Sequence, residues 1–345
     1  MNTARAVVRV MLERYGLVIL MVVLLLFFSI NGRTGSAFTS SANIQNILGN
    51  QSVTAILAIA MVIPLVCDVM DLTVPAVAGV SNVMFAALIG THQQPVLLAA
   101  VLTILGCLAI GCVTAVLVAV YKVNNFIVTL GIFTLLGALL QAYTGGRFLT
   151  KGIPSELGTW GTRLIAGVPL SVAPLIGVAV ITWYVLMHTT YGRELESIGD
   201  NAEAAHLVGL PVQKSTFVAL LASSFLAGVA GILLTSRLGG ADPTAGTSYL
   251  FPALAAVFLG ATVFRIGRYN VWGTVVGVFL TAIAVNGIAL YGAAGWVTPA
   301  FNGAALIVAV TGSNIASRRR VRGDAEPASA ESVADTADPH LAKST

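Results

Sequence analysis

The chain has 345 residues, of which 57% are hydrophobic and only 9% are charged, with a formal net charge of +4. A soluble domain carries about 25% charged residues, so this composition excludes a soluble globular protein and predicts an integral membrane protein. The three cysteines form no C-x-x-C pair and the four histidines are scattered. We therefore expect neither a metal centre nor a redox centre.

Apolar runs follow one another along most of the chain. The first follows several arginines without a clear cleavage site after it, and we interpret it as a retained span and not as a secretory signal. Several runs are shorter than the roughly 20 residues of a straight span, which indicates helices that extend into polar flanks or are broken. The runs are 17–30, 53–66, 72–89, 96–120, 126–142, 164–187, 217–235, 250–264, 271–291 and 297–311. They predict an all-α polytopic membrane protein with about ten transmembrane helices.

Basic residues orient these spans. With an even number of spans both termini lie on one side, and a cytoplasmic N-terminus places most of the 18 lysines and arginines inside, as the positive-inside rule predicts. The basic residues left outside are Arg33, Arg147, Lys151, Arg163 and Arg237. Five spans in each half reverse the second half relative to the first, which predicts two five-helix halves in an inverted repeat, as in transporters.

The C-terminal segment differs in composition from the spans. After Ser317 a short basic run leads into small, acidic and proline residues with almost nothing large to bury. We expect residues 1–316 to form the transmembrane domain and residues 317–345 to form a disordered cytoplasmic tail. The basic run is interpreted as an anchor for anionic lipid headgroups, with a specific partner site as the alternative.

The longest predicted cytoplasmic connection, residues 191–214, has the pattern of a short helix. Asp200 and Asn201 are suited to cap its N-terminus, and Glu203 stands three positions after Asp200, as in a capping box. Gly209 is suited to its C-terminal end, and Pro211 prevents continuation. A helix of about two turns is unstable in water by itself. The segment therefore lies against its own bundle or docks on another protein, and the residues alone leave both open.

The same connection resembles a known family. Gly192-Arg193, 198–201, Ala204-Ala205 and Gly209 are similar to the cytoplasmic loop of ribose-type permeases of bacterial binding-protein-dependent ABC importers, in the branched-chain amino acid/ribose permease superfamily. The resemblance continues through 242–247, 255–260 and 273–277, and earlier through 46–58, 71–74 and 126–131. It covers most of the chain from about residue 43 to residue 310, and the ordered succession of segments is more specific than any single motif.

This resemblance implies a type II ABC importer permease-like fold in which the connection is a coupling helix, seated in a groove of an ATP-hydrolysing subunit. The ATPase-coupling residues that it implies are Arg193, Asn201, Glu203, Ala205 and Gly209. Small residues there would permit close approach, and Glu203 and Arg193 would pair across the interface. On this hypothesis an Ala205→Arg change abolishes docking and leaves the packing of the spans intact.

The sequence also departs from the family pattern. Val69 and Pro75 stand where the family has glycines on either side of its Asp-Leu-Ser-Val motif, and the glycine-rich turn after Gly260 retains only Gly267. These changes leave the scaffold interpretation intact. They do not allow ribose itself to be transferred as the substrate, because they alter helix breaks near the pathway.

Polar residues inside a membrane mark candidate solute routes. Asp71, between two apolar runs, either caps the following helix or contacts solute or a gate. Asn125 and Thr129 begin the fifth predicted span, and Asn286 lies within the ninth. These three either form hydrogen bonds between helices or line the pathway, since an unpaired amide in lipid is costly. We take the four as substrate-pathway candidates.

The chain contains no G-x-x-x-x-G-K-[ST] phosphate loop, so we expect it to bind no cofactor, with ATP and Mg on a partner ATPase. The sequence and the resemblance predict the permease subunit of an ABC importer for a sugar or polyol, in the bacterial cytoplasmic (inner) membrane. The expected partners are the ATPase, an extracytoplasmic solute-binding protein, a second permease copy or paralogue, and membrane lipid, with no nucleic acid.

Other functions stay open from sequence. An ion-coupled secondary transporter needs titratable groups deep in the bundle, and only Asp68 and Asp71 come close to this. An ABC permease for branched-chain amino acids or nucleosides is a further alternative. A membrane enzyme would need a His/Glu metal set or a Ser/His pair, and neither pattern is visible. The sequence does not distinguish among sugars or between a homodimer and a heterodimer.

Overall fold

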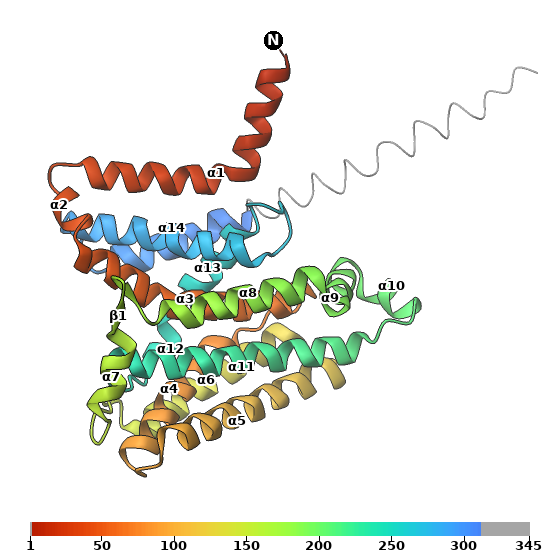
Figure 1. Cartoon of the computed structure of the whole chain (residues 1–345). Helices are drawn as coiled ribbons and strands as arrows, with labels where there is room; N and C mark the ends of the chain where they lie inside the picture. Colours follow the sequence, from red (N-terminus) through yellow and green to blue (C-terminus); the bar gives the residue numbers. More distant parts are fainter. Residues whose placement is uncertain (1, 312–345) are drawn as a thin grey trace, which may run out of the picture.

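The computed structural model describes residues 2–311, so the predicted tail, 317–345, lies outside the described residues. Most of the described chain is helical (Figure 1). The elements are α1 (Asn2–Ile30), α2 (Gly35–Phe38), α3 (Ser41–Val66), α4 (Thr73–Gly90), α5 (Val96–Ala115), the π-helix η1 (Val116–Val120), α6 (Asn125–Thr144), α7 (Ser155–Thr162), β1 (Leu164–Ile165), β2 (Val168–Pro169), α8 (Val172–His188), α9 (Thr190–Asp200), α10 (Ala202–Leu207), α11 (Val212–Leu238), α12 (Ala245–Ser248), α13 (Leu250–Gly260) and α14 (Val271–Leu290). A further apolar helix, Val297–Thr311, ends the described part.

Six of the described helices are long and apolar enough to cross a membrane: α3, α4, α5 with η1, α6, α11 and α14. The bent pair of α8 and α9 adds a seventh if it is counted as one broken span. Three shorter apolar helices, Tyr15–Ile30, Ala245–Gly260 and Val297–Thr311, coincide with the first, eighth and tenth predicted runs. The all-α polytopic class is confirmed, whereas length supports six or seven crossings and not the predicted ten. The inverted five-helix halves stay a prediction.

The centre of the bundle is built from α3, α4 and α11. In their most apolar windows 78% of α3 and 78% of α4 is buried inside the chain, against 22% for Val96–Val120 and 17% for α6. Helix α11 packs against α3, α4 and α5, so it joins the central helices to the periphery. Since α5 and α6 expose large apolar side chains such as Leu97 and Ile127, their outer faces are suited to lipid contact.

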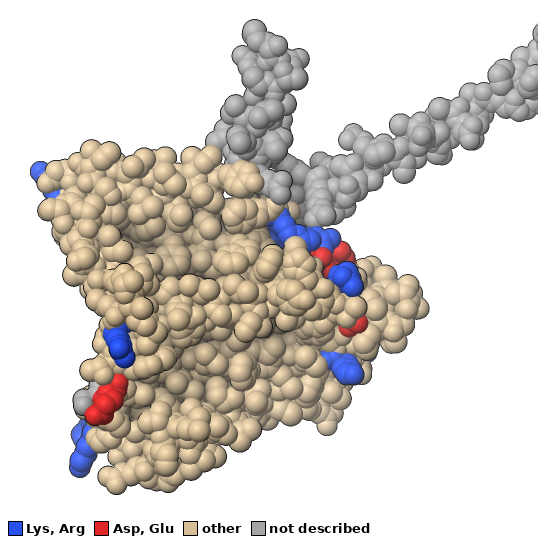
Figure 2. Space-filling view, viewed as in Figure 1, with Lys and Arg blue, Asp and Glu red and all other residues tan. Residues whose placement is uncertain are grey.

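The bundle has two distinct ends. Figure 1 shows α2, α7 and β1 at the left-hand end, which we call the α7 end, and α9 and α10 at the right-hand end, which we call the α10 end. Strands β1 and β2 form an antiparallel hairpin at the α7 end, with Leu164 opposite Pro169. On the face drawn in Figure 2, lysine, arginine and acidic side chains gather at these two ends and leave an uncharged band between them. This band is the expected signature of the membrane-embedded part.

Candidate functional site

Helix α9 turns sharply away from α8 at the α10 end. The two helices are bent by 71° to each other. The Thr189 side chain begins α9 by accepting a hydrogen bond from the Gly192 backbone N–H. A Cβ added to Gly192 would lie 2.1 Å from the Leu186 carbonyl oxygen, so only glycine allows this close return of the chain onto the end of α8. Gly192 is one of the residues that carry the family resemblance, and the close packing of the backbone at this turn explains why a glycine stands there.

The inner face of α9 is fixed in the bundle core. Leu195 is fully buried and Ile198 is 3% exposed. A Cβ on Gly199 would lie 2.1 Å from the Val66 carbonyl oxygen, so α9 touches the end of α3 backbone to backbone. The Tyr191 hydroxyl also donates a hydrogen bond to the Ser215 carbonyl oxygen on α11. Helix α9 is thus held against both α3 and α11.

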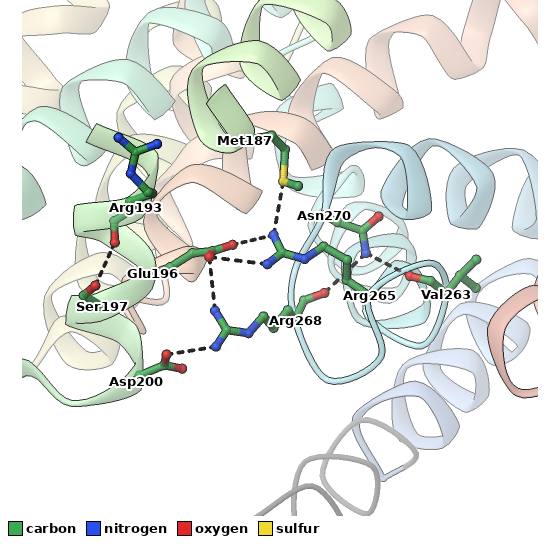
Figure 3. Close-up of polar contacts among 9 residues, drawn as sticks. All are labelled: Met187, Arg193, Glu196, Ser197, Asp200, Val263, Arg265, Arg268 and Asn270. Carbon is green, nitrogen blue, oxygen red and sulfur yellow. Dashed lines mark hydrogen bonds and ion pairs between the residues drawn. The ribbon is translucent and has the colours of Figure 1, made fainter. Parts of the chain in front are cut away.

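The outer face of α9 carries a charged cluster, which consists of Glu196, Asp200, Arg265 and Arg268 (Figure 3). Glu196 binds Arg265 at 2.5 Å and Arg268 at 3.2 Å, and Arg268 reaches Asp200 at 2.9 Å. Both arginines lie in the connection between α13 and α14, and both acids lie on α9. The carboxylate of Glu196 therefore ties α9 to the connection between α13 and α14 with charge-assisted hydrogen bonds.

Helix α10 projects beyond this anchored region. Asn201 is its N-cap and accepts a hydrogen bond from the Ala204 backbone N–H at 2.9 Å. Gly209 ends the segment with φ of +87°, in the left-handed region that favours glycine. Leu207 is 85% exposed and Val208 is 78% exposed, although both are large apolar side chains. Figure 1 shows α10 at the tip of the α10 end.

The structure bears on two expectations for this loop. Asp200 is the last residue of α9 and binds Arg268, so the predicted capping box with Glu203 does not form, because the cap is Asn201. Ala205 is 4% exposed and belongs to the chain's own core. An Ala205→Arg change would therefore disturb the packing of the loop itself, so it is not a clean test of docking, and the predicted intact packing of the spans stays a prediction.

Arg193 and Glu203 are both exposed, as docking residues would be. No hydrogen bond or ion pair joins them to each other within the described chain. The ATPase-coupling role of Arg193, Asn201, Glu203, Ala205 and Gly209 stays a prediction. The structure adds Leu207 and Val208 as the exposed apolar part of the loop.

A cavity of about 840 Å³ opens at the α10 end, between the end of α3, η1 and the α9–α10 segment. Its charged lining residues are Asp68, Lys122, Asp200, Glu203 and Lys214. Partial burial raises the pKa of the Asp68 carboxyl. Tyr269, in the α13–α14 connection, is not a lining residue, but burial and the negative charge of Asp68 raise the pKa of its hydroxyl to about 12. The lining is suited to water and charged groups.

Asp71 is buried at the break between α3 and α4, with 1% of its surface exposed. Its Oδ1 atom accepts hydrogen bonds from the Thr73 backbone N–H and hydroxyl, and its Oδ2 atom accepts one from the Ser223 hydroxyl at 2.7 Å. Asp71 stands one position before Leu72, the N-cap of α4, so these bonds hold the turn that leads into the helix, and a direct role toward solute stays a prediction. The carboxylate is fully engaged inside the chain.

The other pathway candidates do not gather around Asp71 as one site. Thr129 is fully buried and donates to the carbonyl oxygens of Met70 and Asn125, so it ties α6 to the same break. Asn125 begins α6 and accepts from the Phe126 backbone N–H. Asn286 lies elsewhere, paired reciprocally with Asn43 at 3.0 Å in both directions.

Asn286 lies in the wall of a second cavity, of about 420 Å³, which we call the amide pocket. Its walls come from α3, the start of α13, α14 and the helix Val297–Thr311. Its polar lining residues are Asn46, Asn50, Gln51, Thr54, Ser248, Tyr249, Thr281, Asn286, Thr298 and Asn302. None of the lining residues is a lysine, arginine, histidine, aspartate or glutamate.

Sequence reasoning missed the charged cluster as a site and all of the amide pocket except Asn286. A signal for the pocket was present, because Asn46, Asn50 and Thr54 recur every four residues and so share one face of α3. The charged cluster had no such signal, since its arginines are 65 or more positions from its acids. Within the described residues no group of three or more histidine, cysteine or acidic side chains is arranged to hold a metal ion.

These features define a polytopic helical permease with an anchored, projecting loop at one end and polar cavities at both. The family described as "Branched-chain amino acid transport system / permease component" matches residues 43–310, and the chain belongs to this family. It is a transport subunit and not an enzyme. The expected resemblance to ribose-type ABC permeases is thereby confirmed.

Curated relatives cover most of the chain. It is 32% identical over 296 residues to the ribose import permease protein RbsC of Haemophilus influenzae, which covers 85% of this chain and 91% of the relative. It is 31% identical over 276 residues to RbsC of Bacillus subtilis, covering 79% of this chain and 85% of the relative. An autoinducer 2 import system permease protein, LsrD of Photorhabdus temperata, is 31% identical over 220 residues, or 62% of this chain and 66% of the relative. No solved structure was found to match.

Proposed function

We propose that this chain is the membrane-spanning subunit of an ABC importer that moves a sugar or polyol into the cell, driven by ATP hydrolysis on a separate subunit. The observation that carries the proposal is the tip of the loop beyond the anchored α9. Leu207, the last residue of α10, is 85% exposed, and Val208, which follows it, is 78% exposed. Large apolar side chains exposed together mark contact surfaces. The names of the ribose import relatives support the sugar class.

The anchoring of α9 supplies a way to transmit movement. A subunit that binds α10 and closes on ATP displaces the loop as a unit, because α9 is fixed to α3 and α11 by packing and to the α13–α14 connection by the charged cluster. The displacement then reaches helices of both halves of the chain. Access to the solute changes from one end of the bundle to the other as these helices shift.

The proposed assembly contains two ATPase subunits, an extracytoplasmic solute-binding protein and a second permease chain, identical or paralogous. ATP and Mg are held by the ATPases, and this chain binds no cofactor. The α10 end faces the cytoplasm of a bacterial inner membrane, with both termini on that side. The positions of Lys122, Arg193 and Lys214 at the α10 end support this orientation.

The alternative of an ion-coupled secondary transporter requires a carboxylate that can exchange protons or ions with water. Asp71 is the deepest candidate, and its two oxygens are occupied by Thr73 and Ser223. This arrangement favours a structural cap over an ion-coupling group.

The proposal is tested by uptake of labelled ribose, other pentoses, hexoses and polyols into proteoliposomes that enclose ATP. The chain is reconstituted alone, with the neighbouring ATPase, and with both the ATPase and the binding protein. Uptake that requires all three components supports the importer. Uptake by this chain alone, driven by an ion gradient, contradicts it.

A further inference from the structure

We propose that the amide pocket is the site where this chain holds its solute during passage, and that its uncharged lining selects a neutral polyhydroxylated molecule over a charged one. The inference rests on the proposed function and adds to it the place and the chemistry of the solute site. Three observations carry it: the depth of the pocket in the bundle, the polar side chains of the pocket that have no hydrogen-bond partner within the described chain, and the absence of charged residues from its lining.

The pocket reaches deep into the bundle. Thr54 lies 13 positions after the first residue of α3, which places it about 20 Å along the helix axis, near the middle of the span. Polar side chains at this depth are stable only where they face water, solute or other polar protein groups. A concave, polar surface near the midplane is where transporters hold their substrates.

Several polar groups of the pocket have no partner within the described chain. Asn302 is 9% exposed and Thr54 is 5% exposed, yet neither side chain forms a hydrogen bond to any described residue. Neither is sealed from solvent in the way that the unpartnered Thr103 hydroxyl is. Both groups line the cavity, so their unused donors and acceptors are directed to what fills it. Burying such groups without a partner is costly, and a hydroxyl-rich solute would offset that cost.

Other polar groups of the pocket are already engaged and shape it. Asn286 is paired with Asn43, and the Thr281 hydroxyl donates to backbone carbonyl oxygens of its own helix. Asn50 accepts a hydrogen bond from Arg237 at 2.8 Å, although Arg237 is not itself a lining residue. These bonds hold the walls in place and leave Gln51, Thr54 and Asn302 free to bind.

The chemistry of the lining favours sugars. Amide and hydroxyl side chains both donate and accept hydrogen bonds, and they match a solute whose every hydroxyl does the same. A zwitterionic amino acid or a sugar phosphate would have to leave water without a counter-charge among the lining residues, which is strongly unfavourable. Arg237, which bonds Asn50 of the wall, is not a lining residue and also donates to the Gly161 carbonyl oxygen and the Ser171 hydroxyl. A cavity of about 420 Å³ also falls within the roughly 300–1,000 Å³ of small-molecule pockets.

The test uses the complete importer with Asn302→Cys in a Cys112→Ser background, because Cys112 is exposed. The rate of labelling by a membrane-impermeant maleimide is measured in the presence of D-ribose, D-ribose 5-phosphate or L-isoleucine and without solute. Ser36→Cys, in α2 at the same end but outside the pocket, is the control for general effects of solute. We expect ribose to slow labelling by Asn302→Cys about threefold to tenfold, with no effect of the other two solutes and none at the control position.

A second comparison does not depend on cysteine chemistry. Thr54→Val and Thr103→Val each remove one buried, unpartnered hydroxyl, the first inside the pocket and the second outside it. We expect Thr54→Val to lower ATP-driven ribose uptake about threefold to tenfold, and Thr103→Val to stay within about twofold of the unchanged chain.

The outcomes separate the two hypotheses. If the unchanged importer takes up ribose but ribose protects neither thiol and the two valine variants behave alike, the pocket assignment is wrong while the proposed function stands. Equal protection by isoleucine or ribose 5-phosphate would overturn the selection for a neutral solute. If the unchanged importer takes up another pentose, hexose or polyol instead of ribose, that solute replaces ribose in both tests. Absence of ATP-driven uptake of all of these solutes would contradict the proposed function itself.

Discussion

Glu196 on α9 receives hydrogen bonds from both terminal nitrogens of Arg265, 69 positions further along the chain, at 2.5 and 3.4 Å. The pair is about one quarter to one third exposed, so water and salt screen it. The ion pair matters because it holds together two segments, α9 and the α13–α14 connection, that are far apart in the sequence.

We expect Glu196→Gln to lower the free energy of unfolding by about 1 kcal/mol. The carboxylate also binds Arg268, so the cost exceeds that of a single exposed pair. A double-mutant cycle of Glu196→Gln with Arg265→Gln should give a coupling energy of about 0.5–1 kcal/mol, measured by unfolding in detergent. Glu203→Gln, at an exposed position, is the control and should change stability by less than about 0.5 kcal/mol. Additive effects of Glu196→Gln and Arg265→Gln would show that the ion pair contributes nothing.

The exposed tip of α10 gives the second prediction. We expect Leu207→Arg and Val208→Arg each to lower the amount of copurified ATPase about tenfold or more, because a large charge replaces an apolar contact at the centre of the proposed interface. The yield and thermal stability of the chain alone should not change, since these side chains are 85% and 78% exposed.

Ile165→Arg is the matched control for the tip. Ile165 is also apolar and 56% exposed, but it lies in β1 at the α7 end. We expect normal copurification of the ATPase with this variant. Normal copurification with Leu207→Arg and Val208→Arg as well would remove α10 from the interface.

A glycine pair tests the packing of α9. A Cβ on Gly199 would lie 2.1 Å from the Val66 carbonyl oxygen, whereas a Cβ on Gly177 in α8 has no neighbour within 4 Å. We expect Gly199→Ala to destabilise the chain by about 1–3 kcal/mol and to reduce ATP-driven uptake. Gly177→Ala should change stability by less than about 1 kcal/mol. Equal unfolding midpoints for the two variants would show that α9 can move away from α3 at no cost.

The sequence predicted the class of fold and the position of the loop because both depend on local patterns. Apolar runs identify long helices directly, and the Asn201 cap and the Gly209 end are features of a few neighbouring residues. The direction in which Ala205 and Leu207 point was not predictable in this way. It depends on how α9 is bent and anchored. The anchoring contact is with Val66, which is far away in the sequence, and the bend depends on the close approach of Gly192 to the Leu186 backbone, which a sequence pattern does not reveal.

The candidate pathway shows the same limit. Asn286 was identified because an amide inside an apolar run is unusual, but the polar residues that share the pocket with it come from several helices that are far apart in the sequence. Asn46 and Asn302 are 256 positions apart and become one surface only when α3 and the last described helix come together. Asp71 was equally conspicuous in the sequence, yet its carboxylate is bonded to Thr73 and Ser223 inside the bundle and does not line the amide pocket.

Asp71 provides the last prediction, which separates a structural carboxylate from an ion-coupling one. An asparagine at this position keeps an oxygen for the Thr73 backbone N–H and places an N–H₂ group against the Ser223 hydroxyl, which can accept its hydrogen bond. We expect Asp71→Asn to fold and to retain ATP-driven uptake within about threefold of the unchanged chain. Asp71→Leu removes the carboxylate acceptor of the Thr73 and Ser223 groups and leaves the Ser223 hydroxyl only the Leu220 carbonyl oxygen. This change should cost about 2–4 kcal/mol, measured as a lower unfolding midpoint. Normal folding of Asp71→Asn together with complete loss of uptake, in vesicles where an imposed proton gradient drives the unchanged chain, would instead make Asp71 a proton carrier. Because both oxygens of Asp71 are engaged within the described chain and its surface is 1% exposed, a proton could reach this carboxylate only if the break between α3 and α4 opened.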